Sequence, residues 1–190
     1  IGGQMVKKLI ENAENQMKNR VAQRMSTLSP SLTLAISAKA KAMKQAGESV
    51  VWFRVDEPDF NTPQYIIDSA KVALDTGFTK YTPASGMLEL KKAICEKFKK
   101  DNGLDYNPSQ IVISSGAKSS LYHAICAMVE EGDEVIIPSP YWLTYPELVK
   151  LAGGKCVFVK TKKENGYKIT AEELKNAITN KTSLLILNSP

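Results

Sequence analysis

The chain has 190 residues, of which 25 are Lys or Arg, 20 are Asp or Glu and one is His, giving a formal net charge of +5. Hydrophobic residues make up 43%, aromatic residues 7% and charged residues 24%, an ordinary globular composition that excludes a disordered or collagen-like chain. No apolar run approaches the roughly 18 residues that a membrane-spanning helix needs, so we expect no membrane partner.

The cysteines and the histidine restrict the kinds of site that are possible. Cys95, Cys126 and Cys156 are widely spaced and odd in number, which favours neither a disulfide framework nor a zinc site. Because His123 is the single histidine, a Ser-His-Asp triad or a histidine-rich metal site would depend on that residue alone. We therefore predict no metal site and a reducing, cytoplasmic compartment.

Residues 1–26 are rich in Asn, Gln, Lys and Met. Their apolar residues recur at helical spacing and predict an amphipathic helix: Val6, Leu9, Ile10, Ala13, Met17 and Val21. A targeting helix is the alternative, but Glu11 and Glu14 argue against it because transit peptides avoid acidic residues. After the break at Ser29-Pro30-Ser31, a second helix is predicted from about residue 34 to residue 45.

A short apolar stretch at residues 50–55 leads into a turn at residues 56–60. Pro63 is a favoured first residue of a helix, so we predict a helix there with Thr62 as its cap. Another helix is predicted over residues 87–98, where many lysines oppose the apolar stripe and indicate a solvated face. The predicted buried stripe of the helix after Pro63 consists of Ile66, Ala70, Ala73 and Leu74.

From residue 110 onward, apolar runs typical of strands alternate with helical patterns. The strands are predicted at residues 111–113, 135–137, 156–159 and 184–187. The helices are predicted at residues 121–129, at residues 144–151, and from the capping-box pattern Thr170-Ala171-Glu172-Glu173. Because the strands lack polar alternation and are separated by helices, we predict a mostly parallel sheet covered on both faces. The fold class is therefore α/β.

In such sheets, ligands bind beyond the carboxyl ends of the strands. The loop at residues 114–120, Ser-Ser-Gly-Ala-Lys-Ser-Ser, follows a predicted strand and opens a helix. Its small residues would let backbone N–H groups approach an anion, and its hydroxyls would add donors, which together make a phosphate cradle. It lacks the second glycine of a Walker A loop. The alternative is a tight helix start with serine caps.

The loop Pro138-Ser139-Pro140-Tyr141-Trp142 follows the next predicted strand. Two prolines stiffen it, so the aromatic pair has little conformational entropy left to lose. Such a tryptophan beside a phosphate cradle suits stacking on a flat heteroaromatic ring, whereas core packing is the alternative. A further loop begins at Asn188, directly after an apolar run, and we interpret the chain as a piece of a longer protein.

Several motifs together carry a family resemblance from about Met17 to Pro190. They are Lys80-Tyr81-Thr82-Pro83-Ala84-Ser85-Gly86, Ser115-Gly116-Ala117-Lys118, Gly132-Asp133-Glu134-Val135, Pro138-Ser139-Pro140-Tyr141-Trp142, Tyr145-Pro146-Glu147 and Asn188-Ser189-Pro190. In order and spacing the chain resembles class I aminotransferases, which are enzymes of fold type I that depend on pyridoxal 5'-phosphate (PLP). The resemblance is to the prokaryotic-type aspartate aminotransferase branch.

The resemblance implies PLP as cofactor and assigns residues to it. Gly116, Ala117 and Lys118 match the loop that holds the cofactor phosphate, and Trp142 matches the aromatic residue that stacks on the pyridine ring. Tyr81 matches a tyrosine that reaches the cofactor phosphate of the other subunit, which implies a homodimer with shared active sites.

The chain departs from the family at a substrate-binding position. The family usually has Gly-Glu-Pro where this chain has Asp56-Glu57-Pro58, and that glycine contacts the α-carboxylate of the substrate. An aspartate carboxylate at ~4 Å from the substrate carboxylate would repel it by roughly 1–4 kcal/mol. The substrate-binding role of Asp56 therefore depends on its side chain turning away.

The resemblance assigns no catalytic residue to these 190 residues. The lysine that binds the cofactor as a Schiff base is expected downstream of Pro190, because Lys118 belongs to the phosphate loop. By the same resemblance, residues 1–26 are an N-terminal arm, 27–61 a segment of the small domain, and 62–190 the start of the large PLP-binding domain.

The function implied is that of the N-terminal half of an aminotransferase, which moves an amino group between an aspartate-like amino acid and a 2-oxo acid. The alternatives are another fold type I enzyme, such as a C–S lyase or a synthase, and a truncated module that binds PLP or phosphate without turnover. A nucleic-acid-binding module would use the many lysines, but they lack interleaved aromatics and no nucleic-acid motif is present. We therefore expect no nucleic-acid partner.

Overall fold

The computed structural model describes residues 2–18, 22–51, 58 and 60–189. The chain divides into two compact units, one made of Ile1–Ser31 with Leu121–Pro190 and the other of Leu32–Ser120. Among the described residues, no helix has both the length and the apolar character needed to cross a membrane.

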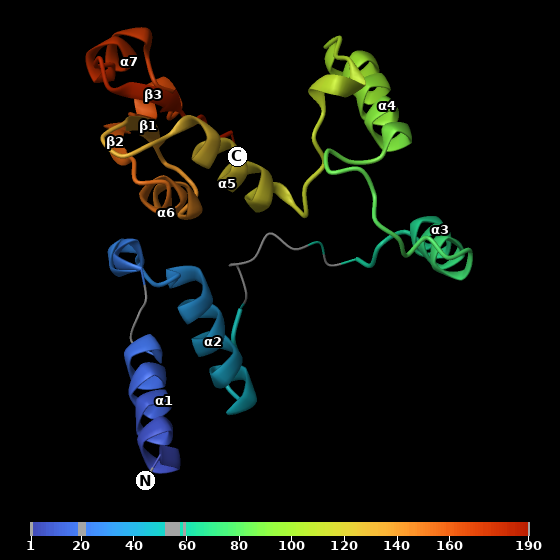
Figure 1. The fold of residues 1–190 in the computed structure, drawn as a ribbon. Helices are drawn as coiled ribbons and strands as arrows, with labels where there is room; N and C mark the ends of the chain where they lie inside the picture. The colour runs from blue at the N-terminus through green and yellow to red at the C-terminus, as the bar shows by residue number, and fades with distance from the viewer. Residues whose placement is uncertain (1, 19–21, 52–57, 59, 190) are drawn as a thin grey trace. The chain divides into compact units, whose positions relative to one another are not determined.

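The first unit contains a three-stranded parallel sheet with the order β2-β1-β3. Its strands are β1 (Glu134–Ser139), β2 (Lys155–Lys160) and β3 (Thr182–Leu185). Parallel neighbours need crossover connections, and α6 (Thr144–Leu151) and α7 (Ala171–Ala177) supply them from opposite sides of the sheet (Figure 1). The predicted α/β class and parallel sheet are confirmed.

The core of this unit lies where α5 (Ala117–Met128) and α6 pack against β1. The central strand is buried on both faces, so consecutive residues of β1 are apolar rather than alternating with polar ones. The buried cluster comprises Ile125, Val129, Val135, Ile137, Leu148, Val149 and Ile186. This packing fixes the ends of β1 and the start of α6, and the Trp142 loop connects the two.

Three further helical elements belong to the same unit. They are α1 (Gly2–Lys18), a 3-10 turn at Gln23–Thr27 and a second 3-10 turn at Lys163–Asn165. The predicted capping box of α7 is present: Thr170 Oγ1 accepts from the N–H of Glu173, and Glu173 Oε2 accepts from the N–H of Thr170.

The second unit is helical. It contains α2 (Leu32–Gln45), α3 (Gln64–Asp75) and α4 (Leu88–Lys97), followed by a π-helical turn at Phe98–Asn102 and a 3-10 turn at Pro108–Gln110. Phe98 meets Tyr106 edge to face, with ring centroids 5.9 Å apart. This contact ties the end of α4 to the loop that leads to residue 111.

Four predictions about this unit differ from the structure. Residues 111–113 form no strand in the described part of the chain, because no described strand pairs with them and a strand exists only as part of a ladder. Pro63 is the N-cap residue of α3, one position earlier in the helix than predicted, and Thr62 does not cap it. None of the predicted buried stripe of α3 is buried: Ile66, Ala70 and Leu74 are exposed, with Ile66 at 45% and Leu74 at 63%, and Ala73 is half-buried.

The fourth difference is Lys91, which was predicted to lie on a solvated face of α4. Its side chain is buried, since only 8% of the residue is exposed. Lys91 Nζ donates to Ser85 Oγ at 2.9 Å, which satisfies the ammonium group away from solvent. Most of the predicted strand at residues 50–55 and the turn residue Asp56 lie outside the described residues.

Candidate cofactor site

The predicted phosphate cradle begins α5. Gly116 has a φ of +82°, a backbone conformation that glycine adopts without steric cost. Its N–H donates to Ser114 O at 2.8 Å, and its own carbonyl accepts from the N–H of Ser119 at 3.2 Å, so the chain reverses sharply into the helix. A Cβ added at Gly116 would meet nothing within 4 Å, so open space lies beside the first turn of α5.

This local geometry suits an anion for two reasons. The first N–H groups of a helix have no partner inside it, and the helix dipole places partial positive charge at its N-terminus. α5 has 12 residues, and its first two, Ala117 and Lys118, are the residues predicted to meet the phosphate. Serine hydroxyls flank the turn on both sides at Ser114 and Ser119. The donor set therefore fits a phosphate group.

The loop at residues 80–86 packs against the segment that leads into the cradle. Ile113 donates its N–H to Ser85 O at 3.1 Å, and Lys91 donates to the hydroxyl of the same serine. Gly86 has a φ of +100°, and a Cβ there would lie 2.3 Å from Ile113 Cγ1. The Lys80–Gly86 motif is thus a support for the phosphate loop within one compact unit.

Tyr81, near the start of that supporting loop, is fully exposed to solvent. A phenol that projects into solvent from a loop whose other end is packed is available to a second molecule.

The predicted ring-stacking residue lies in the other compact unit, on the loop between β1 and α6. Trp142 is 40% exposed and meets Tyr145 edge to face, with ring centroids 5.6 Å apart. Tyr141 turns the other way and stacks on Phe158 of β2, with centroids 5.2 Å apart and an interplanar angle of 19°. The loop therefore holds one aromatic ring against the sheet and leaves the next one partly accessible.

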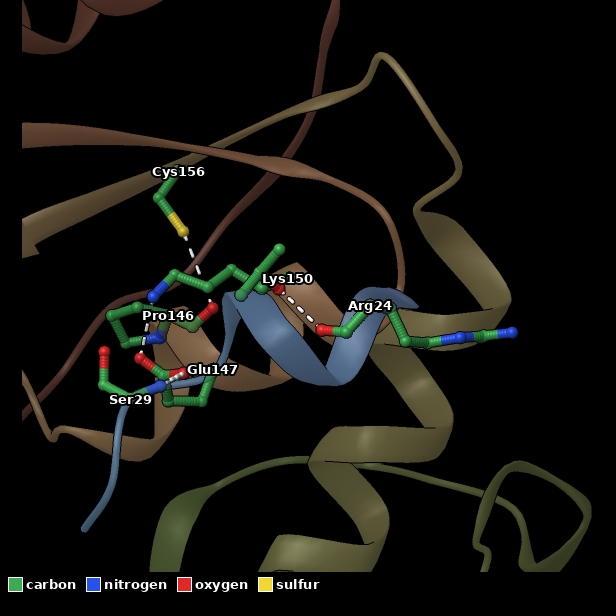
Figure 2. Close-up of polar contacts among 7 residues, drawn as sticks. Arg24, Ser29, Pro146, Glu147, Lys150 and Cys156 are labelled. Atoms are coloured by element: carbon green, nitrogen blue, oxygen red, sulfur yellow. Dashed lines mark hydrogen bonds and ion pairs between the residues drawn. The ribbon is translucent and has the colours of Figure 1, made fainter. Parts of the chain in front are cut away.

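The start of α6, which follows the Trp142 loop, is held by the N-terminal segment (Figure 2). Ser29 donates its N–H to Glu147 Oε2 at 2.9 Å, and Lys150 Nζ donates to Glu147 Oε1 at 2.9 Å. Burial raises the pKa of Glu147, but these hydrogen bonds to Lys150 and Ser29 outweigh it, so the pKa lies below its ordinary value. The carboxylate is therefore charged at neutral pH and joins the segment around residue 29 to α6.

Cys156 lies on β2 beside this carboxylate, with its Sγ 3.7 Å from the carbonyl oxygen of Pro146 (Figure 2). Burial raises the pKa of the Cys156 thiol, which disfavours the thiolate form. All three cysteines are free thiols. Among the described residues, no group of three or more His, Cys, Asp or Glu side chains is arranged to hold a metal ion.

The sequence predicted roles for Gly116, Ala117, Lys118, Tyr81 and Trp142, but it did not indicate the groups that contact these loops. Ser85 was noted only as part of a motif, Lys91 was assigned to solvent, and Thr161 was not singled out. Thr161 is buried, and its hydroxyl donates to the carbonyl of Ser139 at the end of β1. These contacts join residues distant in sequence, and no local pattern signals them.

Comparison with known proteins decides the family. A model of the family "Aminotransferase class I and II" matches residues 48–190, which is most of the chain and includes both the cradle and the Trp142 loop. The chain belongs to the aminotransferase class I and II family.

Relatives within this family share both sequence and structure with the chain. It is 55% identical over 171 residues to the aspartate aminotransferase of Bacillus subtilis, an alignment that covers 90% of the chain and 44% of that relative. The crystal structure of the aspartate aminotransferase from Rhizobium meliloti superposes with a TM-score of 0.85 at 44% identity, covering 90% of the chain and 43% of that protein.

The aspartate aminotransferase from Thermus thermophilus with maleate superposes with a TM-score of 0.86 at 40% identity, covering 90% of the chain and 45% of that protein. The chain thus spans less than half the length of these aminotransferases, and its α/β fold is that of their corresponding part. The predicted resemblance and fold are confirmed.

Proposed function

We propose that the whole protein is a PLP-dependent aminotransferase that moves an amino group between an aspartate-like amino acid and a 2-oxo acid. The observation that carries this proposal is the cradle at Gly116, which lies at the N-terminus of the 12-residue helix α5 in a chain of the aminotransferase class I and II family. The space that a Cβ at Gly116 would occupy is open. The matched relatives named aspartate aminotransferase support the choice of substrate class.

We assign the cofactor phosphate to Gly116, Ala117 and Lys118 and the cofactor ring to Trp142. When bound, PLP supplies an electron sink that stabilises negative charge on the carbon bearing the amino group. The residues of this chain bind and orient: the first turn of α5 attracts the phosphate, and Trp142 offers an aromatic face for stacking. We place the lysine that holds the cofactor covalently outside these 190 residues, as the 44% coverage of the relatives allows.

Support for a dicarboxylic substrate comes from the neighbour that was solved with maleate, a dicarboxylate. At the position of Asp56 the family has a glycine, and we propose that this residue lies near the α-carboxylate of the substrate. A carboxylate side chain there weakens anion binding unless it turns away from the substrate.

We further propose a homodimer in which Tyr81 reaches the cofactor phosphate of the partner subunit. The complete exposure of Tyr81 supports this role, because a tyrosine that packs on nothing in its own unit has its ring and hydroxyl available to a second copy. A reducing cytoplasmic compartment agrees with the three free thiols. In the whole protein we retain the division into an arm at residues 1–26, a small-domain segment at 27–61 and a large-domain segment at 62–190.

The experiment compares two glycine variants of the full-length protein. Gly116 and Gly103 both have positive φ, +82° and +67°, and a Cβ at either position meets nothing within 4 Å. Gly116→Ala and Gly103→Ala therefore carry a similar backbone cost, but only the first places a methyl group in the cradle. We expect Gly116→Ala to weaken PLP binding at least about tenfold, which equals ~1.4 kcal/mol, and Gly103→Ala to leave it unchanged.

PLP affinity is measured by titrating the cofactor-free protein and following the visible absorbance of bound cofactor. Equal affinities of the two variants would contradict the assignment of the cradle. Products of aspartate turnover distinguish the alternatives, because amino transfer yields a new amino acid from the 2-oxo acid, whereas a lyase releases fragments of its substrate without needing an acceptor.

A further inference from the structure

At the end of β1, where the Trp142 loop departs, side-chain hydrogen bonds add to the strand ladder that joins β1 to β2. The paired register of the two strands ends at Ser139 and Lys160. Pro140 follows, and because proline has no N–H it cannot donate the next ladder bond. The hydroxyl of Thr161, one residue beyond the last pair, donates to the carbonyl of Ser139 and so adds a separate link at this point.

Thr161 is well suited to this contact because it is shielded from water. Only 6% of the residue is exposed, whereas its neighbours Lys160 and Lys162 are exposed. A buried hydroxyl that loses its hydrogen bond is left unsatisfied, which gives the bond from Thr161 its energetic weight. A second, longer bond reinforces it: Ser139 Oγ donates to Val159 O at 3.4 Å.

The aromatic stack continues this attachment toward Trp142. Tyr141 lies two residues after Ser139 and stacks on Phe158, also in β2. The backbone is therefore fixed at Ser139 and the side chain at Tyr141, so the position of the next residue, Trp142, is restricted. The contacts of Ser139 and Tyr141 come from β2 and the residue after it, whereas the Trp142 ring itself meets Tyr145 at the start of α6.

We propose that Thr161 is a positioning residue for the cofactor ring: by holding the carbonyl of Ser139 it sets the direction of the loop and thereby the orientation of Trp142. This inference rests on the proposed function, in which Trp142 stacks on PLP. Phe158 acts in the same way through Tyr141, and the residue is 52% exposed, so replacing it disturbs little of the core.

The test uses the full-length protein with PLP and three threonine variants. Thr161→Val removes the hydroxyl at nearly constant volume, and Thr161→Ser keeps it. The matched control is Thr179→Val, which removes a hydroxyl that contacts the opposite end of β1, where Thr179 Oγ1 donates to Glu134 Oε2 at 2.8 Å. PLP affinity, the visible circular dichroism of the bound cofactor and thermal stability are measured for each.

We expect Thr161→Val to weaken PLP binding about tenfold and to alter the visible circular dichroism. Thr161→Ser should bind PLP within about threefold of the unmodified protein and show its circular dichroism spectrum. Thr179→Val should change only thermal stability. Phe158→Leu keeps the proposal testable if Thr161→Val fails to fold, and it should shift the dichroism in the same direction. Unchanged affinity and dichroism in Thr161→Val or in Phe158→Leu, with normal PLP binding by the unmodified protein, would overturn this inference alone. Failure of the unmodified protein to bind PLP would overturn both this inference and the proposed function.

Discussion

Gly86 offers the sharpest test of how the phosphate loop is supported. At its φ of +100° an alanine is strained, since left-handed backbone costs an L-residue roughly 1–2 kcal/mol. The added Cβ would also lie 2.3 Å from Ile113 Cγ1 and 2.6 Å from Ile113 Cβ, far inside van der Waals contact. Forcing atoms apart in a packed site costs roughly 1–3 kcal/mol. The Gly86→Ala change should therefore destabilise the protein by about 2–5 kcal/mol.

The assay is urea denaturation followed by far-ultraviolet circular dichroism, with PLP affinity measured in parallel. Gly103→Ala is the control, because its φ of +67° imposes backbone strain while its Cβ would meet nothing within 4 Å. The free energy of unfolding of Gly103→Ala should fall only by the cost of this strain, roughly 1–2 kcal/mol, and its PLP affinity should be unchanged. Because Ile113 leads directly into the cradle, Gly86→Ala should also weaken PLP binding. Equal losses of stability in the two variants would refute the reasoning from the Ile113 contact.

Other predictions concern substrate binding, pH and helix capping. Asp56→Gly should lower the KM for aspartate at least about fivefold, since repulsion of ~1 kcal/mol or more is removed; steady-state kinetics test it, and a rise in KM would contradict it. The lowered pKa of Glu147 contributes stability that is present above the ordinary value of 4.5 and is lost as pH falls through the folded pKa. Glu147→Gln should thus lower the melting temperature at pH 7 and have little effect well below that pKa, whereas an equal effect at both pH values would count against the Ser29 and Lys150 contacts. Thr170→Ala should cost about 1 kcal/mol by removing the cap of α7 while Thr170→Ser should not, as denaturation midpoints would show.

Local signals predicted the elements that depend on local chemistry. The bounds of α6 and the capping box of Thr170 and Glu173 follow from helix periodicity and from a side chain that reaches three residues along the chain. The strands of the sheet follow from short apolar runs that a fully covered parallel sheet requires. β3 (Thr182–Leu185), however, begins and ends two residues before the predicted range 184–187. The glycine at position 116 and the helix that it opens were also predicted, because both lie within a single loop.

The failures have a common cause, which is dependence on distant partners. Residues 111–113 have the composition of a strand but lack a described strand to pair with. Lys91 carries a polar head group, and its burial is accompanied by a hydrogen bond to the hydroxyl of Ser85, six residues away in sequence. Thr161 resembles any loop threonine in sequence, and its contact with Ser139 exists only because two strands lie side by side.

The most direct test of the central proposal is amino transfer by the full-length protein supplied with PLP, aspartate and a 2-oxo acid acceptor, with both products measured. We predict that aspartate is converted to its 2-oxo acid in an amount equal to the new amino acid formed, and that the reaction requires PLP. Protein that binds PLP but forms no amino acid from the acceptor, or that forms products of elimination instead, would contradict it.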